Sequence, residues 1–286
     1  LRSMQRDPGF AADDVLCAVT TLSFDIAGLE MYLPLICGGQ VVVATEADHR
    51  DPQALCELIE RSGCTVLQTT PSLLKLVEEI GYDSVFAGLR LLVGGEALPL
   101  ALARSLAARC RGMWNLYGPT ETTIWSTVAP IDAGVEVVPL GRPIANTRIS
   151  VLDRRGQPVP PGVIGEIMIA GDGVADGYLG EPALTAQRFV PESFHAGGGR
   201  MYRTGDLGAW RDGVLYFHGR ADHQIKIRGF RIEPGDIEAV AGADPSVREC
   251  VVVAHRFGEN DLRLVLYAVV DGDRLDAFWA RTMWLR

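Results

Sequence analysis

Short apolar strands alternate with helical patterns from residue 14 to residue 116, and this alternation constrains the fold more than any other feature. Each apolar or β-branched run is followed by a segment with apolar residues at helical spacing. Because strands joined through a helix pair in parallel, we predict an α/β fold with a layered βα core. The predicted strands are residues 15–19, 41–44, 65–68, 90–93 and 113–116, and the predicted helices are 26–36, 52–62, 72–80 and 99–110. We expect Ser72 to cap the third helix and Pro99 to lie in the first turn of the fourth.

The pattern changes twice further along the chain. After about residue 130, short strands at 149–152, 165–169 and 214–218 are separated by Gly, Pro and Asp turns, which predicts a small β-rich subdomain. After residue 221, strands at 224–228, 250–254 and 262–270 and a helix at 233–241 predict a partial C-terminal α+β subdomain. We therefore predict an α/β part at 1–130, a β-rich part at 131–221 and a mobile C-terminal part at 222–286.

The composition argues against several classes of function. A formal net charge of −9 at pH 7 makes nucleic acid or an anionic membrane an unsuitable main partner. The six cysteines are scattered without a metal-ligand spacing, and no apolar run is long enough to span a bilayer. These features predict a cytoplasmic protein, and a first residue other than Met predicts an excerpt from a longer chain.

The sequence Asn-Leu-Tyr-Gly-Pro-Thr-Glu-Thr-Thr-Ile-Trp at residues 115–125 brings together a turn, hydroxyl groups and one carboxylate. Backbone amides, hydroxyl donors and a carboxylate oxygen are suited to a nucleotide phosphate and its Mg²⁺. Taken alone, the stretch is more typical of a strand that ends in a Gly-Pro turn, with Thr120 and Glu121 capping the next helix. The neighbouring motifs decide between these interpretations.

Further motifs lie on both sides of this stretch. Phe24-Asp25-Ile26-Ala27-Gly28 precedes it, and it is followed by Gly165-Glu166-Ile167 with Gly177-Tyr178-Leu179, by Tyr202-Arg203-Thr204-Gly205-Asp206-Leu207, and by residues 219–233. In this order and spacing, the set resembles the adenylation domains of nonribosomal peptide synthetases, which are adenylate-forming enzymes. The resemblance covers roughly residues 14–270.

The resemblance implies ATP and Mg²⁺ as cofactors. By this resemblance, Asn115 reads the adenine edge, Tyr117 and Phe217 flank the base, and Asp206 accepts from the ribose hydroxyls with Arg220 as a charged partner nearby. Thr120 would bind the α-phosphate and Glu121 would hold the metal. The expected nucleotide-binding residues are Gly95, Asn115, Tyr117, Gly118, Thr120, Asp206, Phe217 and Arg220, and the expected catalytic residues are Thr120, Glu121 and Lys226. Taken singly, Asp206 reads as a turn carboxylate and Arg220 as half of a surface ion pair.

The family's substrate pocket also falls on identifiable residues. Asp25 would pair with the α-ammonium group of an amino acid, and bulky side chains would leave little room for a substrate side chain. This combination resembles the family's glycine-type pocket, although apolar residues in such positions are also typical of an ordinary core. The expected pocket residues are Asp25, Ile26, Leu29, Gln68, Leu92, Gly94, Leu116, Ile124 and Trp125.

The resemblance also implies partners and a moving part. Asp222 would be the hinge of the C-terminal subdomain, and Lys226 fits the face used when the aminoacyl group is passed to phosphopantetheine on a peptidyl carrier domain. Alternatively, Asp222 is a plain turn residue and Lys226 a solvated strand lysine. A condensation domain is a further expected partner, and residues 184–189 resemble the region where small MbtH-like helper proteins dock.

Two family features are missing from the sequence. The chain holds neither a Ser/Thr/Gly-rich phosphate loop nor the late lysine that contacts the substrate carboxylate. Three hypotheses therefore stand: a ligase domain that activates an amino acid, most simply glycine; an aryl- or acyl-acid ligase of the same superfamily; and a non-catalytic remnant that binds a nucleotide or a partner.

Overall fold

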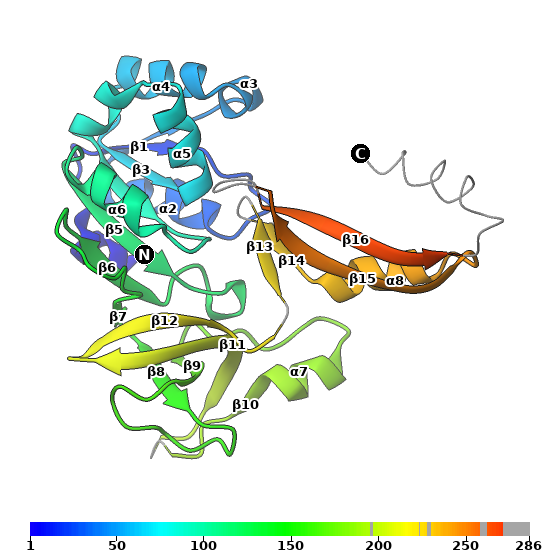
Figure 1. Ribbon diagram of the computed structural model, residues 1–286. Helices are drawn as coiled ribbons and strands as arrows, with labels where there is room; N and C mark the ends of the chain where they lie inside the picture. The colour runs from blue at the N-terminus through cyan, green and yellow to red at the C-terminus, as the bar shows by residue number, and fades with distance from the viewer. Residues whose placement is uncertain (195–196, 223, 228–229, 258–261, 271–286) are drawn as a thin grey trace. The chain divides into compact units, whose positions relative to one another are not determined.

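The chain divides after Ala221 into two units, Leu1–Ala221 and Asp222–Arg286. The computed structural model describes residues 1–194, 197–222, 224–227, 230–257 and 262–270 (Figure 1).

A seven-stranded sheet in the order β2-β1-β3-β4-β5-β6-β7 organises the first unit. The first five strands in this order pair in parallel, and β6 and β7 add to the edge in antiparallel fashion. This arrangement confirms the predicted α/β core. The strands are β1 (Val15–Ala18), β2 (Gln40–Val43), β3 (Val66–Thr69), β4 (Arg90–Val93), β5 (Gly112–Tyr117), β6 (Thr127–Ile131) and β7 (Arg142–Pro143).

Helices cover both faces of this sheet, so alternate strand residues enter two separate cores. On β4, Leu91 and Val93 belong to a core with residues of α4, α5 and α6, whereas Leu92 belongs to a second core with residues of α2 (Figure 1). The helices and helical turns of this unit are α1 (Arg2–Met4), η1 (Gln5–Gly9), α2 (Ala27–Cys37), α3 (Glu46–Arg50), α4 (Pro52–Arg61), α5 (Pro71–Glu79), η2 (Asp83–Gly88), α6 (Leu100–Ala107), η3 (Thr120–Thr122) and α7 (Pro182–Arg188).

An antiparallel sheet follows in the same unit, in the order β10-β11-β9-β8 with β12 paired to β11. Its strands are β8 (Thr147–Leu152), β9 (Gly165–Gly171), β10 (Phe189–Pro191), β11 (Arg200–Arg211) and β12 (Val214–Arg220). Leu215 of β12 is bridged to Gly141, just before β7, through hydrogen bonds of 3.2 and 2.9 Å. Strands β6 and β7 continue the first sheet past residue 130. The division of this unit into an α/β part and a β-rich part at that residue stays a prediction.

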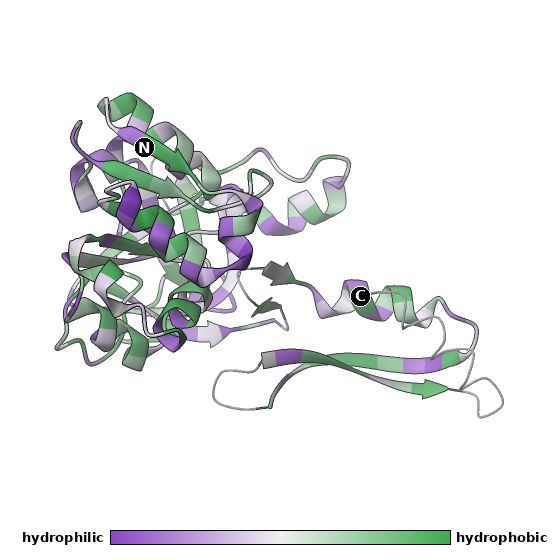
Figure 2. Cartoon of the chain, turned by 90° about the horizontal axis from the view of Figure 1, so that it is seen from above, coloured by the Kyte–Doolittle hydropathy of each residue, from purple (hydrophilic) through white to green (hydrophobic). Residues whose placement is uncertain are grey.

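The second unit contains one helix and two hairpins among its described residues. The elements are β13 (Ile225–Ile227), β14 (Phe230–Ile232), α8 (Pro234–Gly242), β15 (Val247–Arg256) and β16 (Leu262–Val270). The two long strands are hydrophobic along much of their length (Figure 2). The predicted strand at 224–228 is shorter in the structure, and its last residue lies outside the described part.

The local predictions were correct for most elements but wrong at two caps. Thr70, not Ser72, accepts the N–H of Leu73, because Pro71 already occupies the first helical turn. Pro99 is extended and lies just before α6 rather than inside its first turn. Among the described residues, no helix is long and apolar enough to cross a membrane.

Gly141 provides a test of how the two sheets are joined. Its φ of 98° is left-handed, and an added Cβ would overlap the Val128 carbonyl oxygen. We expect Gly141→Ala to lower the free energy of unfolding by roughly 2–4 kcal/mol, since overpacking adds to backbone strain. Denaturant unfolding of the chain measures this. Gly156→Ala, at φ 76° with no atom near its Cβ, should cost only about 1 kcal/mol; equal losses would contradict the steric argument.

Candidate active site

The segment from Gly118 to Ser126 reverses the chain between β5 and β6. Gly118 has no room for a side chain, since a Cβ would lie 2.5 Å from the Ile124 carbonyl oxygen. Thr123 and Ile124 adopt left-handed φ values of 65° and 69°, a conformation that strains residues other than glycine. Ser126 N–H closes the reversal on the Tyr117 carbonyl at 2.8 Å. This turn, rather than the alternative capped α-helix, carries the residues predicted to bind phosphate and metal.

Asp25 lies in the turn before α2 and reaches this reversed segment. Its Oδ2 accepts the Ile124 N–H at 3.2 Å, and the Thr120 hydroxyl and the Ile26 N–H also hydrogen-bond to its carboxylate. Burial raises the pKa of Asp25, the hydrogen bonds oppose that shift, and the charge of Glu121 adds to it. The donors around Asp25 are neutral, so its negative charge is compensated only in part.

The predicted pocket residues are gathered around the end of α2 and the ends of β4 and β5. The apolar ones form one buried cluster, and a Cβ on Gly28 would lie 3.3 Å from Ile124 Cδ1. Gly94 permits the Trp125 indole to lie directly against the backbone, since any Cβ there would overlap the ring. The members of the cluster among the predicted residues are Ile26, Leu29, Leu92, Leu116, Ile124 and Trp125. These residues are therefore both core and potential pocket lining.

Gln68 is a polar residue inside this apolar cluster and is completely buried. Its Oε1 accepts the Trp125 indole N–H at 2.9 Å, while its Nε2 donates to the Ile26 carbonyl at 2.8 Å and to Glu30 Oε1 at 2.9 Å. Glu30, also completely buried, was missed by sequence reasoning. The sequence feature that could have identified Glu30 is an acidic residue among apolar residues in a predicted helix, because a buried carboxylate requires a partner.

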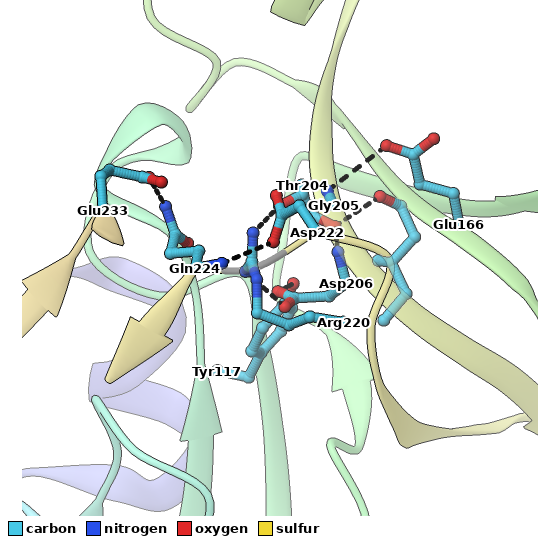
Figure 3. Close-up of polar contacts among 10 residues, drawn as sticks. Tyr117, Glu166, Thr204, Gly205, Asp206, Arg220, Asp222, Gln224 and Glu233 are labelled. Carbon is cyan, nitrogen blue, oxygen red and sulfur yellow. Dashed lines mark hydrogen bonds and ion pairs between the residues drawn. The ribbon is translucent and has the colours of Figure 1, made fainter. Parts of the chain in front are cut away.

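Tyr117 of β5, Asp206 of β11 and Arg220 of β12, three of the predicted nucleotide residues, lie together (Figure 3). Asp206 Oδ2 accepts the Tyr117 hydroxyl at 2.6 Å, and its Oδ1 accepts from Arg220 at 2.6 Å. Arg220 also donates to the Thr204 carbonyl at 3.1 Å. Burial, followed by the charge of Asp206, raises the pKa of Tyr117 well above its usual value. Arg220 and the Tyr117 hydroxyl are thus both partners of the proposed ribose acceptor.

Three other predicted nucleotide residues occupy different settings. Asn115 is buried on β5 and donates from Nδ2 to the Pro139 carbonyl at 2.7 Å, which directs its Oδ1 to act as the acceptor. Phe217 on β12 is 38% exposed, so its ring has surface available for stacking. Gly95 follows β4 with a left-handed φ of 82°.

Glu121 is the carboxylate predicted to hold Mg²⁺, and it is buried at the start of η3. The Tyr178 hydroxyl donates to Glu121 Oε1 at 2.6 Å and lies 3.3 Å from the Tyr202 hydroxyl. Burial is the main reason that the pKa of Tyr178 is raised. Among the described residues no cluster of three metal-ligating side chains occurs. One carboxylate fits Mg²⁺ held largely by phosphate oxygens rather than by a protein cage. Tyr178 lies in the motif Gly177-Tyr178-Leu179, but the sequence did not predict its hydrogen bond to Glu121.

The remaining predicted residues belong to the second unit. Asp222 is its first residue, and its Oδ1 accepts the Gln224 N–H at 3.3 Å. Lys226 pairs with Arg231 in the β13–β14 hairpin, and its side chain lies outside the described part. Their assignment as hinge and catalytic residue stays a prediction.

Comparison with known proteins identifies the family. The profile of the AMP-binding enzymes matches residues 1–179, more than half of the chain. The chain therefore belongs to the family of AMP-binding enzymes. Within that family it is an adenylation domain of the kind found in nonribosomal peptide synthetases, as its relatives agree.

Three relatives illustrate the similarity. A dimodular nonribosomal peptide synthase of Bacillus subtilis is 50% identical over 95% of this chain, which spans 11% of that protein's length. A solved four-domain nonribosomal peptide synthetase bound to AMP and glycine is 41% identical, with a TM-score of 0.73 over 96% of this chain and 21% of its own. A solved protein with adenylation and PCP domains, bound to a vinylsulfonamide inhibitor, is 30% identical, with a TM-score of 0.86 over 97% of this chain and 49% of its own.

The raised pKa of Asp25 predicts that this carboxylate weakens the fold. A buried acid whose folded pKa exceeds the usual 3.8 destabilises the folded state once it ionises. We expect Asp25→Asn to raise the thermal midpoint of the chain at pH 7, because an amide retains the Ile124 hydrogen bond without the charge.

The pH profile supplies the control. The advantage of Asp25→Asn should grow as pH rises from near 3.8 through the raised pKa of Asp25 and then stay constant. Asp132→Asn is the control for the substitution itself, because it replaces an exposed carboxylate that accepts the Gly134 N–H, and it should not raise the midpoint at pH 7. A lower midpoint for Asp25→Asn at pH 7 would contradict the raised pKa.

Proposed function

We propose that this domain activates an amino acid with ATP, forming an aminoacyl-AMP and pyrophosphate. The single observation that carries the proposal is the position of Asp25. Its incompletely compensated carboxylate is hydrogen-bonded to the turn that carries Thr120 and lies within electrostatic reach of Glu121. An α-ammonium group at Asp25 would supply the missing positive charge and bring the substrate carboxylate toward the phosphate side of the turn.

In this proposal the chemistry is an in-line attack of a substrate carboxylate oxygen on the α-phosphorus, with pyrophosphate as the leaving group. Asn115 would accept from the adenine amino group through Oδ1, and Asp206 would accept from the ribose hydroxyls beside the guanidinium of Arg220. Once a substrate ammonium group replaces it at Asp25, the Thr120 hydroxyl would donate to the α-phosphate. Glu121, held by Tyr178, would be the carboxylate ligand of Mg²⁺. The metal, when bound, offsets phosphate charge. The protein contributes mainly position and preorganised charge.

We infer glycine as the substrate. Trp125 occupies the space above Gly94, and the surrounding pocket positions Ile26, Leu29, Leu92 and Leu116 are buried against one another. A substrate side chain would have to displace these groups, which costs roughly 1–3 kcal/mol for overpacking. The solved synthetase bound to AMP and glycine supports this choice.

Pyrophosphate exchange by the full-length protein tests the substrate. Exchange should be strongest with glycine and at least about tenfold weaker with leucine, following the overpacking cost. Trp125→Leu should narrow this preference by admitting larger amino acids. Trp210→Leu is the matched control, because it makes the same replacement at a partly buried tryptophan of another core. It should leave the preference for glycine unchanged. Exchange with leucine but not with glycine would contradict the glycine assignment.

The later steps belong to the same proposal. The aminoacyl group would pass to a phosphopantetheine thiol on a peptidyl carrier domain, which the solved protein with adenylation and PCP domains supports. Asp222 would act as the hinge and Lys226 would serve the thiol-transfer state. A condensation domain would use the loaded amino acid, and an MbtH-like helper would dock near α7, on which no residue is buried.

An aryl- or acyl-acid ligase is the second candidate within the superfamily. Asp25 argues against it, because a substrate without an ammonium group leaves a buried carboxylate without its cation. Asp25→Ala should abolish glycine-dependent exchange. Unchanged activity in that variant would favour the acid ligase.

A non-catalytic remnant is the third candidate. Calorimetry of the chain with ATP and Mg²⁺, beside the exchange assay, separates nucleotide binding without turnover from an active domain.

A further inference from the structure

Glu30 occupies the centre of a buried polar network beneath the proposed pocket. It is 0% exposed on α2, and the site described above assigns it no contact with a substrate. Its Oε2 accepts the Thr20 N–H at 2.9 Å, and its Oε1 accepts the Thr20 hydroxyl at 2.6 Å and Gln68 Nε2 at 2.9 Å. The Val19 N–H also hydrogen-bonds to this carboxylate. Each of these contacts requires Glu30 to accept.

This requirement determines which way the Gln68 amide points. An amide has a donating and an accepting end, and the Glu30 carboxylate can receive only the donating end. The Ile26 carbonyl makes the same demand on Nε2 at 2.8 Å. The accepting end, Oε1, must therefore face away from Glu30, where it receives the Trp125 indole N–H at 2.9 Å.

The indole in turn sets the depth of the pocket. Trp125 is 2% exposed and lies against Gly94, where any Cβ would overlap its ring. Apolar packing alone would tolerate sliding or tilting of the ring, whereas a hydrogen bond to a buried and oriented amide specifies one position. Removing the acceptor would leave the indole N–H buried without a partner, which favours a displaced ring.

We propose that Glu30 is a positioning residue for substrate selectivity, which holds Trp125 in the pocket-filling position through the orientation of Gln68. The selectivity part of this inference rests on the proposed amino-acid activation; the structural part does not. Glu30 makes no contact with substrate in this scheme. Its effect passes through two hydrogen bonds, so its loss should widen the pocket rather than abolish the chemistry.

The first test needs no substrate. Glu30→Gln preserves the length of the side chain but brings donors to a site already filled with donors. Gln68 Nε2 is then expected to lose this acceptor, so that the Ile26 carbonyl alone orients the amide and the hydrogen bond to the Trp125 indole weakens. In the ¹⁵N-labelled chain, the Trp125 indole N–H resonance is assigned by its loss in Trp125→Phe. We expect its hydrogen exchange to accelerate about tenfold in Glu30→Gln, as for the loss of one buried hydrogen bond.

Glu192→Gln is the matched control, because Glu192 is also a buried glutamate but pairs with Arg148 in the antiparallel sheet. Its effect on the Trp125 exchange rate should be nil. Thr20→Val removes one donor to Glu30 and should accelerate exchange to a smaller extent. If Glu30→Gln does not fold, the exchange rate in Thr20→Val tests the proposal instead. Exchange rates equal to wild type in the folded variants would overturn the proposal.

The second test measures selectivity in the full-length protein. The ratio of kcat/KM for glycine to that for alanine should fall about tenfold in Glu30→Gln, mainly through a lower KM for alanine, and should not change in Glu192→Gln. An unchanged ratio with accelerated indole exchange would refute the selectivity role. If wild type does not use glycine at all, the proposed substrate fails, while the indole measurement still decides whether Glu30 positions Trp125.

Discussion

The structure of the site depends on the close approach of two backbone segments at Gly118. Because Gly118 has no Cβ, the Ile124 carbonyl oxygen can lie 2.5 Å from the position that a Cβ would occupy. Ile124 and Trp125 therefore lie beside the end of β5. The return forces Thr123 and Ile124 into left-handed conformations that cost on the order of 1–3 kcal/mol each. The Asp25–Ile124 and Ser126–Tyr117 hydrogen bonds and the burial of Trp125 offset this strain. One short turn thereby holds Glu121 on one side and the pocket residues on the other.

The carboxylates of the site differ in how their charges are compensated. Asp206 faces a guanidinium, and Glu121 accepts from a phenol whose pKa is raised by burial. Among the described residues, Asp25 accepts from the Thr120 hydroxyl and from backbone amides, and burial raises its pKa. In the proposed scheme, a substrate cation would therefore gain most at Asp25. These differences in charge compensation, rather than the mere presence of acidic residues, distinguish the proposed ammonium position from the proposed metal and ribose positions.

The proposed pocket and the hydrophobic core are made of the same side chains. Ile26, Leu29 and Leu92 are 1–3% exposed and pack in one cluster with residues that are not predicted to line the pocket, such as Leu33 and Val66. A pocket for the smallest amino acid can be built in this way, because the substrate side chain that it would have to hold is only a hydrogen atom. Polar groups inside such a pocket must be satisfied internally, and Gln68 and Glu30 satisfy each other.

The sequence by itself determined the α/β alternation, the order of the motifs and the residues that the turn at 115–125 would contribute. These follow from local periodicity and from residue types that suit nucleotide chemistry. The extra antiparallel strands β6 and β7 and the Thr70 cap were not predicted, because short edge strands and competing caps carry little local signal. Only the tertiary structure decided that Arg220 pairs with Asp206, that Tyr178 holds Glu121 and that Glu30 lies under Trp125 through Gln68. Each of these contacts joins residues at least 14 positions apart in the chain, and hydrogen-bond geometry between distant segments is set by packing rather than by local sequence.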